Sequence, residues 1–190
     1  MPRRRRHTLD FENLKLPGVV LFHTVRYGDE RGYFMERYKR SALLEGGVDE
    51  TFVQSNLSFS RRGILRGIHY QAAPAGQGKL LQVLSGAIFD VVVDVTPDSP
   101  TFGEWLAVEI SAENGNLLYV PPQYGHAFCT LTDDCLLLYD VTYEYAPEQE
   151  RGIIWNDPSL NIPWPVSEPV VSAKDALLPT IESLRAGAAR

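Results

Sequence analysis

Residues 79–95 decide the fold, and they read KLLQVLSGAIFDVVVDV. Two apolar runs, 79–84 and 87–95, are separated by Ser85 and Gly86, which suit a two-residue hairpin turn between antiparallel strands. The second run alternates between two faces, as a β-strand does. One face carries Phe89, Val91, Val93 and Val95, and the other carries Asp90, Val92 and Asp94. We expect two strands here, with aromatic residues such as Phe89 in the core.

More short extended segments follow on both sides of this stretch. Residues 104–110, 116–120, 126–131 and 135–145 continue the series, with turn residues between them. Without a βαβ alternation, this pattern predicts an antiparallel sandwich, jelly roll or barrel. Short helices are expected only at 40–45 and at 172–188, where Ser172 is the predicted N-cap and Pro179 interrupts the helix.

Length and composition favour a single domain. The chain has 190 residues, of which 44% are hydrophobic, enough for one sizeable core. We expect a basic tail over residues 1–15 and one domain over residues 16–190. Residues 3–6 are four arginines, and without them 14 Lys and Arg face 24 Asp and Glu, a charge of −10. An acidic body argues against general binding to nucleic acid or to an anionic membrane.

Two further features bear on the cell compartment. No apolar stretch approaches the roughly 18 residues that span a bilayer, and the basic start lacks a signal-peptide core. We therefore expect a soluble, cytoplasmic protein. Cys129 and Cys135 flank a polar stretch in which a hairpin could bring them together, but without a secretion signal reduced thiols are favoured over a disulfide.

Four polar residues stand in or beside the strands: His69, Lys79, His126 and Tyr139. Strict alternation places Tyr139 on the same face as Leu137, so Tyr139 points inward if Leu137 does. Each of them taken alone is more often structural than catalytic. No second histidine or glutamate stands near His69 at metal-ligand spacing, which disfavours a metal site and leaves the histidines free for proton transfer. Glycine-rich phosphate loops are also missing, so a phosphate would need side chains such as Arg31 and Arg66.

Nine short motifs in register resemble the dTDP-4-dehydrorhamnose 3,5-epimerase family. They span roughly Val19 to Pro179 and include residues 28–36 (GDERGYFME), 65–71 (LRGIHYQ), 99–103 (SPTFG), 155–158 (WNDP) and 172–175 (SAKD). The resemblance implies a metal-free cupin jelly roll without a cofactor. It also implies a dimer in which amino-terminal segments are exchanged. The implied substrate is a dTDP-linked 4-keto-6-deoxy sugar that is inverted at C3 and C5.

The resemblance also implies roles for particular residues. His69 matches the catalytic base, Asp175 the carboxylate that orients it, Lys79 the cation near the C4 oxygen, and Tyr139 the acid on the opposite face. Substrate-contacting positions match Arg31, Glu36, Gln54, Asn56, Arg66, His126, Glu150 and Lys174, with Arg31 and Glu36 contributed across the dimer. Without the resemblance, Asp175 reads as an exposed residue at a helix start and Lys79 as a solvated lysine.

Some positions depart from the family pattern. Ser55 and Leu57 stand where many members have Asp and His, and Gln82 stands where an arginine is common. Because these positions lie near the substrate-binding segments, an epimerase that inverts only C3 or only C5 of a related nucleotide-linked keto sugar stays open as an alternative. Two alternatives of other classes are a nucleotide-sugar-binding cupin without catalysis and a metal-dependent cupin, which is the least favoured.

Overall fold

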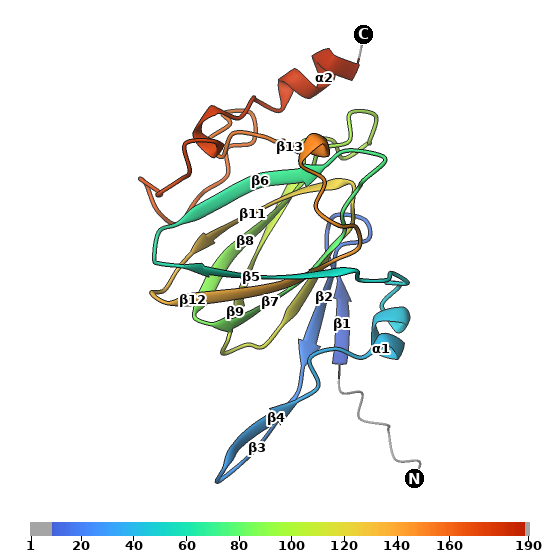
Figure 1. Cartoon of the computed structure of the whole chain (residues 1–190), viewed down its shortest axis with the longest axis vertical. Coiled ribbons are helices and arrows are strands. Elements are labelled where there is room, and N and C mark those ends of the chain that lie inside the picture. The colour runs from blue at the N-terminus through green and yellow to red at the C-terminus, as the bar shows by residue number, and fades with distance from the viewer. Residues whose placement is uncertain (1–8, 189–190) are drawn as a thin grey trace.

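The computed structural model describes residues 9–188, and the arginine run at residues 3–6 lies outside them. Two antiparallel sheets pack face to face, as the strand pattern predicted (Figure 1). The six-stranded sheet has the order β1-β2-β10-β7-β12-β5, and the five-stranded sheet has the order β13-β6-β11-β8-β9. A separate two-stranded hairpin, β3 and β4, projects from the body at the end opposite the carboxy-terminal helix α2.

The strands and helices have the following bounds. The six-stranded sheet contains β1 (Leu9–Asn13), β2 (Val20–Thr24), β10 (Leu117–Val120), β7 (Lys79–Ser85), β12 (Cys135–Val141) and β5 (Gln54–Ser60). The five-stranded sheet contains β13 (Glu150–Gly152), β6 (Leu65–Gln71), β11 (Tyr124–Thr130), β8 (Ala87–Asp94) and β9 (Trp105–Ser111). The remaining elements are β3 (Arg26–Asp29), β4 (Gly32–Met35), α1 (Arg40–Glu45), η1 (Pro147–Gln149), η2 (Asp175–Leu177) and α2 (Glu182–Ala188).

Apolar side chains fill three layers. The central layer lies between the sheets and includes Leu81, Leu118 and Leu137 opposite Ile88 and Val92. A second layer packs α1 and neighbouring residues on the outer face of the six-stranded sheet. A third packs the carboxy-terminal stretch on the outer face of the five-stranded sheet, over Val91, Val93 and the half-buried Phe89 and Trp105. Both faces of β8 are therefore covered, which explains why its sequence is a nearly continuous apolar run.

The predicted hairpin at Ser85 and Gly86 is wrong. Strands β7 and β8 lie in different sheets, where β7 pairs with β10 and β12, and β8 pairs with β11 and β9. Gly86 has a φ of +79°, and a Cβ there would collide with Thr132. The chain thus uses this glycine to cross from one sheet to the other, which a local turn signal cannot distinguish from a hairpin.

The residues between the two cysteines likewise connect the two sheets, from β11 to β12, so they form no hairpin. Both thiols are free and buried, and burial raises the pKa of each to about 11. Reduced packing residues were the favoured reading, and the free thiols agree with it.

The ends of the chain also differ from expectation. Leu9–Asn13, predicted to belong to the basic tail, forms β1 and pairs along its full length with β2. The helix at 40–45 is confirmed. The helical segment 172–188 is broken into η2 and α2, with Pro179 between them, and β12 ends at Val141 rather than at Tyr145. Among the described residues, no helix is long and apolar enough to cross a membrane.

Candidate active site

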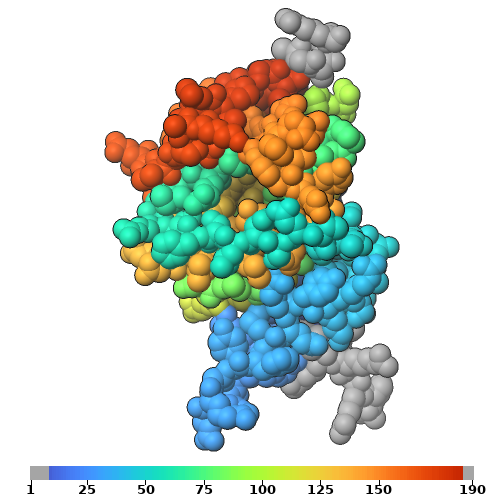
Figure 2. Space-filling view, viewed as in Figure 1, coloured from blue at the N-terminus to red at the C-terminus, as the bar shows by residue number. Residues whose placement is uncertain are grey.

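A cavity of about 530 Å³ opens at one end of the space between the two sheets. In the space-filling view the surface is hollowed between the teal segment around β5 and β6 and the orange and red segments that follow β12 (Figure 2). Eight of the twelve predicted site residues line this cavity: Arg66, His69, Lys79, His126, Tyr139, Glu150, Lys174 and Asp175. Residues from five strands and from the carboxy-terminal segment therefore converge on one place.

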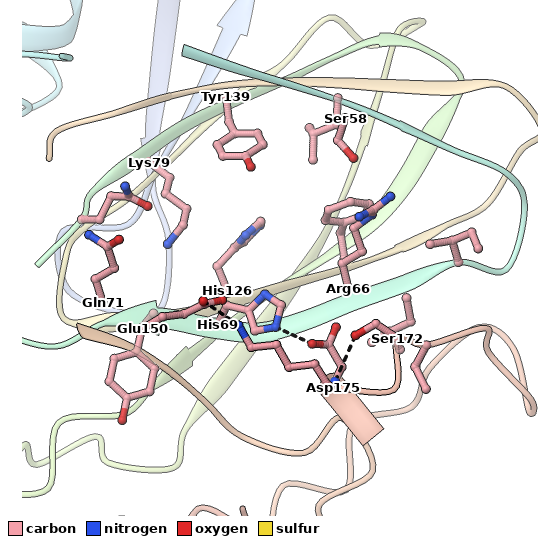
Figure 3. Close-up of a pocket in the computed structure, with 18 of the residues that line it drawn as sticks. Ser58, Arg66, His69, Gln71, Lys79, His126, Tyr139, Glu150, Ser172 and Asp175 are labelled. Carbon is pink, nitrogen blue, oxygen red and sulfur yellow. Dashed lines mark hydrogen bonds and ion pairs between the residues drawn. The ribbon is translucent and has the colours of Figure 1, made fainter. Parts of the chain in front are cut away.

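A histidine and a carboxylate form a pair on one wall of the cavity. His69 Nε2 lies 2.8 Å from Asp175 Oδ1, while the other carboxylate oxygen, Oδ2, accepts a hydrogen bond from the Gly67 backbone N–H at 3.3 Å. Asp175 is buried, but the His69 side chain remains 32% exposed toward the cavity. With Nε2–H donated to Asp175, the second ring nitrogen, Nδ1, keeps its lone pair and faces the cavity (Figure 3). This arrangement suits a base.

Local backbone geometry holds this pair in place. Gly67 has a φ of +116°, and a Cβ on it would lie 2.6 Å from Ala127 Cβ, so β6 approaches β11 here more closely than another residue allows. The register between these strands shifts at the same point. On the other side, the Asp175 N–H donates to Ser172 Oγ at 3.0 Å. The N-cap position of η2 is Lys174 and not the predicted Ser172, but the Ser172 hydroxyl still holds the turn that leads into η2 through this hydrogen bond.

The segment that carries Asp175 is fastened to the five-stranded sheet. Leu65 N–H donates to the Val170 carbonyl at 3.0 Å, and Val170 N–H donates to the Gly63 carbonyl at 2.9 Å. Further along, Ile154 N–H donates to the Pro179 carbonyl at 2.8 Å. These hydrogen bonds fix the wall of the cavity near Asp175 from both directions, so the carboxylate has a defined position.

Tyr139 and Lys79 lie on the opposite wall, on β12 and β7 of the six-stranded sheet (Figure 3). Leu137 points into the core, so Tyr139 also points inward, as alternation predicted. Burial raises the pKa of Tyr139, although Arg66 opposes the shift, so the phenol stays protonated at neutral pH. Burial lowers the pKa of Lys79 to about 8, against the raising effect of the Asp90 charge.

A second histidine and carboxylate lie deeper. His126 Nε2 is 2.8 Å from Asp90 Oδ2, and both side chains are buried. His126 lines the cavity, whereas Asp90 lies behind it. Since His126 and His69 are directly paired residues of β11 and β6, the two histidines sit side by side on the same wall.

Charged and polar groups surround the mouth of the cavity. Glu150 Oε2 accepts hydrogen bonds from Lys174 Nζ and from the Tyr145 hydroxyl, both at 2.6 Å. Burial raises the pKa of Glu150, but these hydrogen bonds outweigh it, and the pKa lies below its usual value. Arg66 Nε donates to Ser60 Oγ at 3.3 Å, and its exposed guanidinium retains N–H groups for an anion.

Four predicted residues do not line the cavity. Gln54 and Asn56 lie just beyond it on β5 and are hydrogen-bonded to each other at 2.8 Å, while Gln54 Oε1 accepts from the Tyr145 N–H. Arg31 is exposed at the tip of the β3–β4 hairpin and pairs with Asp29. Glu36 follows β4. The hairpin projects away from the sandwich, so neither Arg31 nor Glu36 reaches the cavity of its own chain (Figure 1).

Sequence reasoning missed Ser58 and Tyr145 as cavity residues. Ser58 could have been found, because it follows Gln54 and Asn56 at a spacing of two along one strand and shares their face. Its buried hydroxyl has no hydrogen-bond partner among the described residues. No local signal marks Tyr145, since it lies in an irregular segment after β12 and its hydroxyl meets Glu150 only in the folded chain.

The arrangement suits acid–base chemistry on a carbon acid. A base on one wall, and a proton donor with a buried ammonium beside it on the other, match the needs of proton removal beside a carbonyl. Within residues 9–188, no group of three or more His, Cys, Asp or Glu side chains is placed to hold a metal ion.

Comparisons with known proteins agree with this geometry. The family described as dTDP-4-dehydrorhamnose 3,5-epimerase matches residues 13–183. A protein of that name from Shigella flexneri is 46% identical over 162 residues, which cover 85% of this chain and 90% of the relative. A crystal structure of the Legionella pneumophila enzyme in complex with dTDP-4-keto-L-rhamnose is 39% identical with a TM-score of 0.89, covering 94% of this chain and 96% of that one.

A third relative differs in its named activity. The structure of a 3'-monoepimerase from Streptomyces bikiniensis in complex with dTDP-quinovose is also 39% identical, with a TM-score of 0.87, covering 92% of this chain and 89% of that one. The fold, the cavity and the matched residues all agree with one assignment. The chain belongs to the dTDP-4-dehydrorhamnose 3,5-epimerase family.

Proposed function

We propose that this protein inverts C3 and C5 of dTDP-4-dehydro-6-deoxy-D-glucose to give dTDP-4-dehydro-L-rhamnose. The observation that carries the proposal is the placement of His69 and Tyr139 on opposite sheets of one cavity, with Lys79 beside Tyr139. Inversion at carbon requires proton removal from one face and proton delivery to the other, and these two residues face each other across the space where a sugar ring would lie.

Each inversion begins at His69. The C4 carbonyl acidifies the hydrogens on C3 and C5, and Nδ1 of His69 takes one of these protons. The electron pair of the broken C–H bond moves into the C4 oxygen, which becomes an enolate. Asp175 keeps the imidazole in the tautomer with a free Nδ1 and stabilises the imidazolium that forms. Lys79 supplies positive charge to the enolate oxygen, an interaction stronger in the transition state than in the ketone.

Tyr139 then completes the inversion. Its hydroxyl gives a proton to the opposite face of the carbanion carbon, and the enolate collapses back to the ketone. The phenolate then recovers a proton from solvent, and the His69 imidazolium releases its proton to solvent, so both residues are ready for the second inversion. Burial helps because it keeps the phenol protonated until a more basic carbon is presented to it. His126 contacts the sugar hydroxyls beside the carbonyl.

The nucleotide end of the substrate lies at the mouth of the cavity. Arg66 and Lys174 supply the positive charge for the diphosphate, and a guanidinium can bind phosphate oxygens through two N–H groups at once. Gln54 and Asn56 carry amides at the edge of the same face of β5, where they contact the nucleoside. Glu150 holds Lys174 in position. The cytoplasmic location expected from the sequence belongs to the same proposal.

Product analysis tests the reaction. The protein is incubated with dTDP-4-dehydro-6-deoxy-D-glucose, the keto sugars are reduced with borohydride, and the resulting 6-deoxyhexoses are identified by NMR. We expect sugars of the L-rhamno series, which require inversion at both carbons. Recovery of only gluco- and galacto-configured sugars, the reduction products of unreacted substrate, would reject the proposal.

A single inversion is the second candidate. It is supported by the likeness to the Streptomyces bikiniensis 3'-monoepimerase, as similar in identity as the Legionella enzyme. The unusual residues Ser55, Leu57 and Gln82 do not line the cavity, whereas the four residues proposed for catalysis do. These departures from the family pattern therefore give no ground for preferring a single inversion, and the same reduction experiment identifies a product inverted at C3 alone.

A homodimer is the second part of the proposal. Arg31 and Glu36 do not reach their own cavity, and the hairpin beside them exposes Tyr33 and Phe34 at 61% and 66%. The outer face of the six-stranded sheet near β5 also exposes apolar side chains, namely Val53, Leu57, Phe59 and Leu84. A second copy of this chain would cover both features, and its hairpin would bring Arg31 to the diphosphate in the first copy.

Mixed dimers test this arrangement. Arg31→Ala and His69→Ala are each expected to lose most activity when assayed alone. After mixing through partial denaturation and refolding, half of the dimers contain both variants, and each of these has one intact site. Activity should return to about a quarter of the wild-type value. No recovery, with mixed dimers demonstrated by mass spectrometry, would show that Arg31 serves its own chain or none.

A further inference from the structure

Asp90 on β8 is a buried carboxylate directly behind the cavity. Its exposed fraction is 0%, and it does not line the cavity. One oxygen, Oδ2, lies 2.8 Å from His126 Nε2, while the other, Oδ1, has no hydrogen-bond partner among the described residues. A buried carboxylate oxygen without a partner is costly, so a purely structural role would be better served by a neutral side chain.

Lys79 is a buried group of the opposite charge. The residue is only 7% exposed, and neither a hydrogen bond nor an ion pair holds its ammonium within the part of the chain that the structure describes. Burial alone would drive such a group toward the neutral amine. The negative charge that acts on Lys79 is that of Asp90, on the facing sheet. In turn, His126 and Lys79 oppose the burial that raises the pKa of Asp90.

We propose that Asp90 is a positioning residue for the reaction, because its carboxylate orients His126 and supplies the negative charge that faces the Lys79 ammonium. The inference rests on the proposed function, in which Lys79 stabilises the enolate and His126 contacts the sugar. Asp90 itself touches no substrate atom. It acts by fixing the His126 tautomer with Nε2 protonated, and by keeping Lys79 cationic at the pH where the enzyme works.

Other titratable or charged groups line the same cavity. They are His69, Arg66 and Tyr70 on β6, Tyr139 on β12, Glu150 on β13, and Tyr145, Lys174 and Asp175, in addition to His126 on β11. Glu150 already accepts two hydrogen bonds at the mouth, and Tyr139 is neutral at working pH. Asp175 is committed to His69 and to Gly67. Of these acidic groups, Asp90 has a carboxylate oxygen without a hydrogen-bond partner, and its negative charge acts on the Lys79 ammonium.

The Lys79 titration is measured directly, without reference to activity. The chain contains four lysines, so protein with 13C-labelled lysine gives four Cε signals, and the Lys79 signal is the one missing in Lys79→Met. In Asp90→Asn, which keeps the shape and an oxygen for His126 but loses the charge, we expect Lys79 to titrate lower by about one pH unit or more. An unchanged titration would overturn the proposal.

Asp94→Asn is the matched control. Asp94 is a second buried aspartate on the same strand, but it accepts hydrogen bonds from the Thr101 hydroxyl and the Thr96 N–H, away from the cavity. The free energy of unfolding of this variant should be lower than that of the wild type, but Lys79 should titrate at the same pH as in the wild type. An equal shift in Asp94→Asn would mean that general loosening, not the Asp90 charge, moves Lys79, and it would overturn the proposal.

Activity supplies the second readout. In Asp90→Asn the alkaline limb of the kcat profile should move down with the Lys79 titration, while KM changes by less than a few-fold. If the wild type does not turn over the substrate, the proposed function fails, but the titration of Lys79 still tests the role of Asp90.

If Asp90→Asn does not fold, the 15N spectrum of His126 in the wild-type protein provides the test. A proton on Nε2 of the neutral ring would support the proposal, and a proton on Nδ1 would overturn it.

Discussion

His69 and Asp175 are 106 residues apart in the chain, and His69 Nε2 lies 2.8 Å from Asp175 Oδ1. The contact exists because the carboxy-terminal segment returns across the five-stranded sheet and is held there by backbone hydrogen bonds to Gly63 and Leu65. The carboxylate that orients the proposed base thus comes from a segment that follows the last strand of the sandwich.

Asp175→Asn should lower kcat by roughly a hundredfold or more, because an amide cannot stabilise the imidazolium and can impose the wrong tautomer on His69. Steady-state kinetics check this. Ser172→Ala, which removes only the hydrogen bond to the Asp175 N–H, should cost less than tenfold. Comparable losses in both variants would indicate that the position of the segment matters and the carboxylate charge does not.

Tyr139→Phe should separate proton removal from inversion. His69 remains able to take a proton and return it to the same face, so solvent deuterium should still enter the substrate while product formation falls sharply. Tyr145→Phe is the control, because its hydroxyl binds Glu150 at the mouth and should affect KM more than inversion. If Tyr139→Phe lost exchange and inversion equally, Tyr139 would have no separate role as the acid.

Lys79 should make activity and stability respond to pH in opposite directions. Its folded pKa of about 8 lies below its usual value of 10.5, because burial disfavours the ammonium. Between these two values the unfolded chain holds the proton and the folded chain does not, so the Lys79 contribution makes the free energy of unfolding rise as pH increases. The ammonium that we propose stabilises the enolate is lost over the same range, so kcat should fall as pH rises through about 8.

Lys79→Met tests both effects. It should remove the pH dependence of stability that arises between about 8 and 10.5 and raise the free energy of unfolding at pH 7 by up to about 3 kcal/mol. Turnover should nearly disappear. Denaturant unfolding at several pH values measures the first effect. A Lys79→Met variant that is less stable than the wild type at pH 7 would contradict the picture of a buried charge held for catalysis.

Gly67→Ala should destabilise the fold and disturb the base. The added Cβ would meet Ala127 at 2.6 Å, at a φ that disfavours any side chain, so we expect a loss of about 2 kcal/mol or more together with reduced kcat. Gly63→Ala is the control, since Gly63 also has a positive φ but nothing lies within 4 Å of its Cβ position. Equal losses in both variants would show that the close strand approach at Gly67 carries no extra cost.

Short extended runs between turn residues predicted the strands, and period-two alternation predicted the inward face of Tyr139, because Leu137 on the same face of β12 lies in the core. It could not predict sheet membership. Ser85 and Gly86 carry the local signal of a turn, and whether the chain turns back or crosses to the other sheet depends on distant partners such as Thr132. Leu9–Asn13 was missed as a strand for a similar reason, since most of β1 is exposed and only pairing with β2 defines it.

For the site, too, the sequence predicted some residues, while others depended on contacts that only the fold creates. His69, Lys79 and Tyr139 were identified as polar residues of the strands and Arg66 as a candidate phosphate ligand, their roles came from the family resemblance, and the fold brings them together. Asp90 was noted only as a polar residue on an alternating strand, because its contact with His126 depends on the register between β8 and β11. Arg31 and Glu36 lie outside the cavity of their own chain, and the site proposed for them lies in a second copy.

Incorporation of deuterium from solvent tests the central claim most directly. Wild-type protein is incubated in deuterated water with dTDP-4-dehydro-6-deoxy-D-glucose, and the label at each carbon is measured by NMR. We predict deuterium at both C3 and C5, and none at either carbon in His69→Ala. Label at one carbon alone would replace the double inversion with a single one. Absence of label at both carbons in the folded wild type would contradict the account.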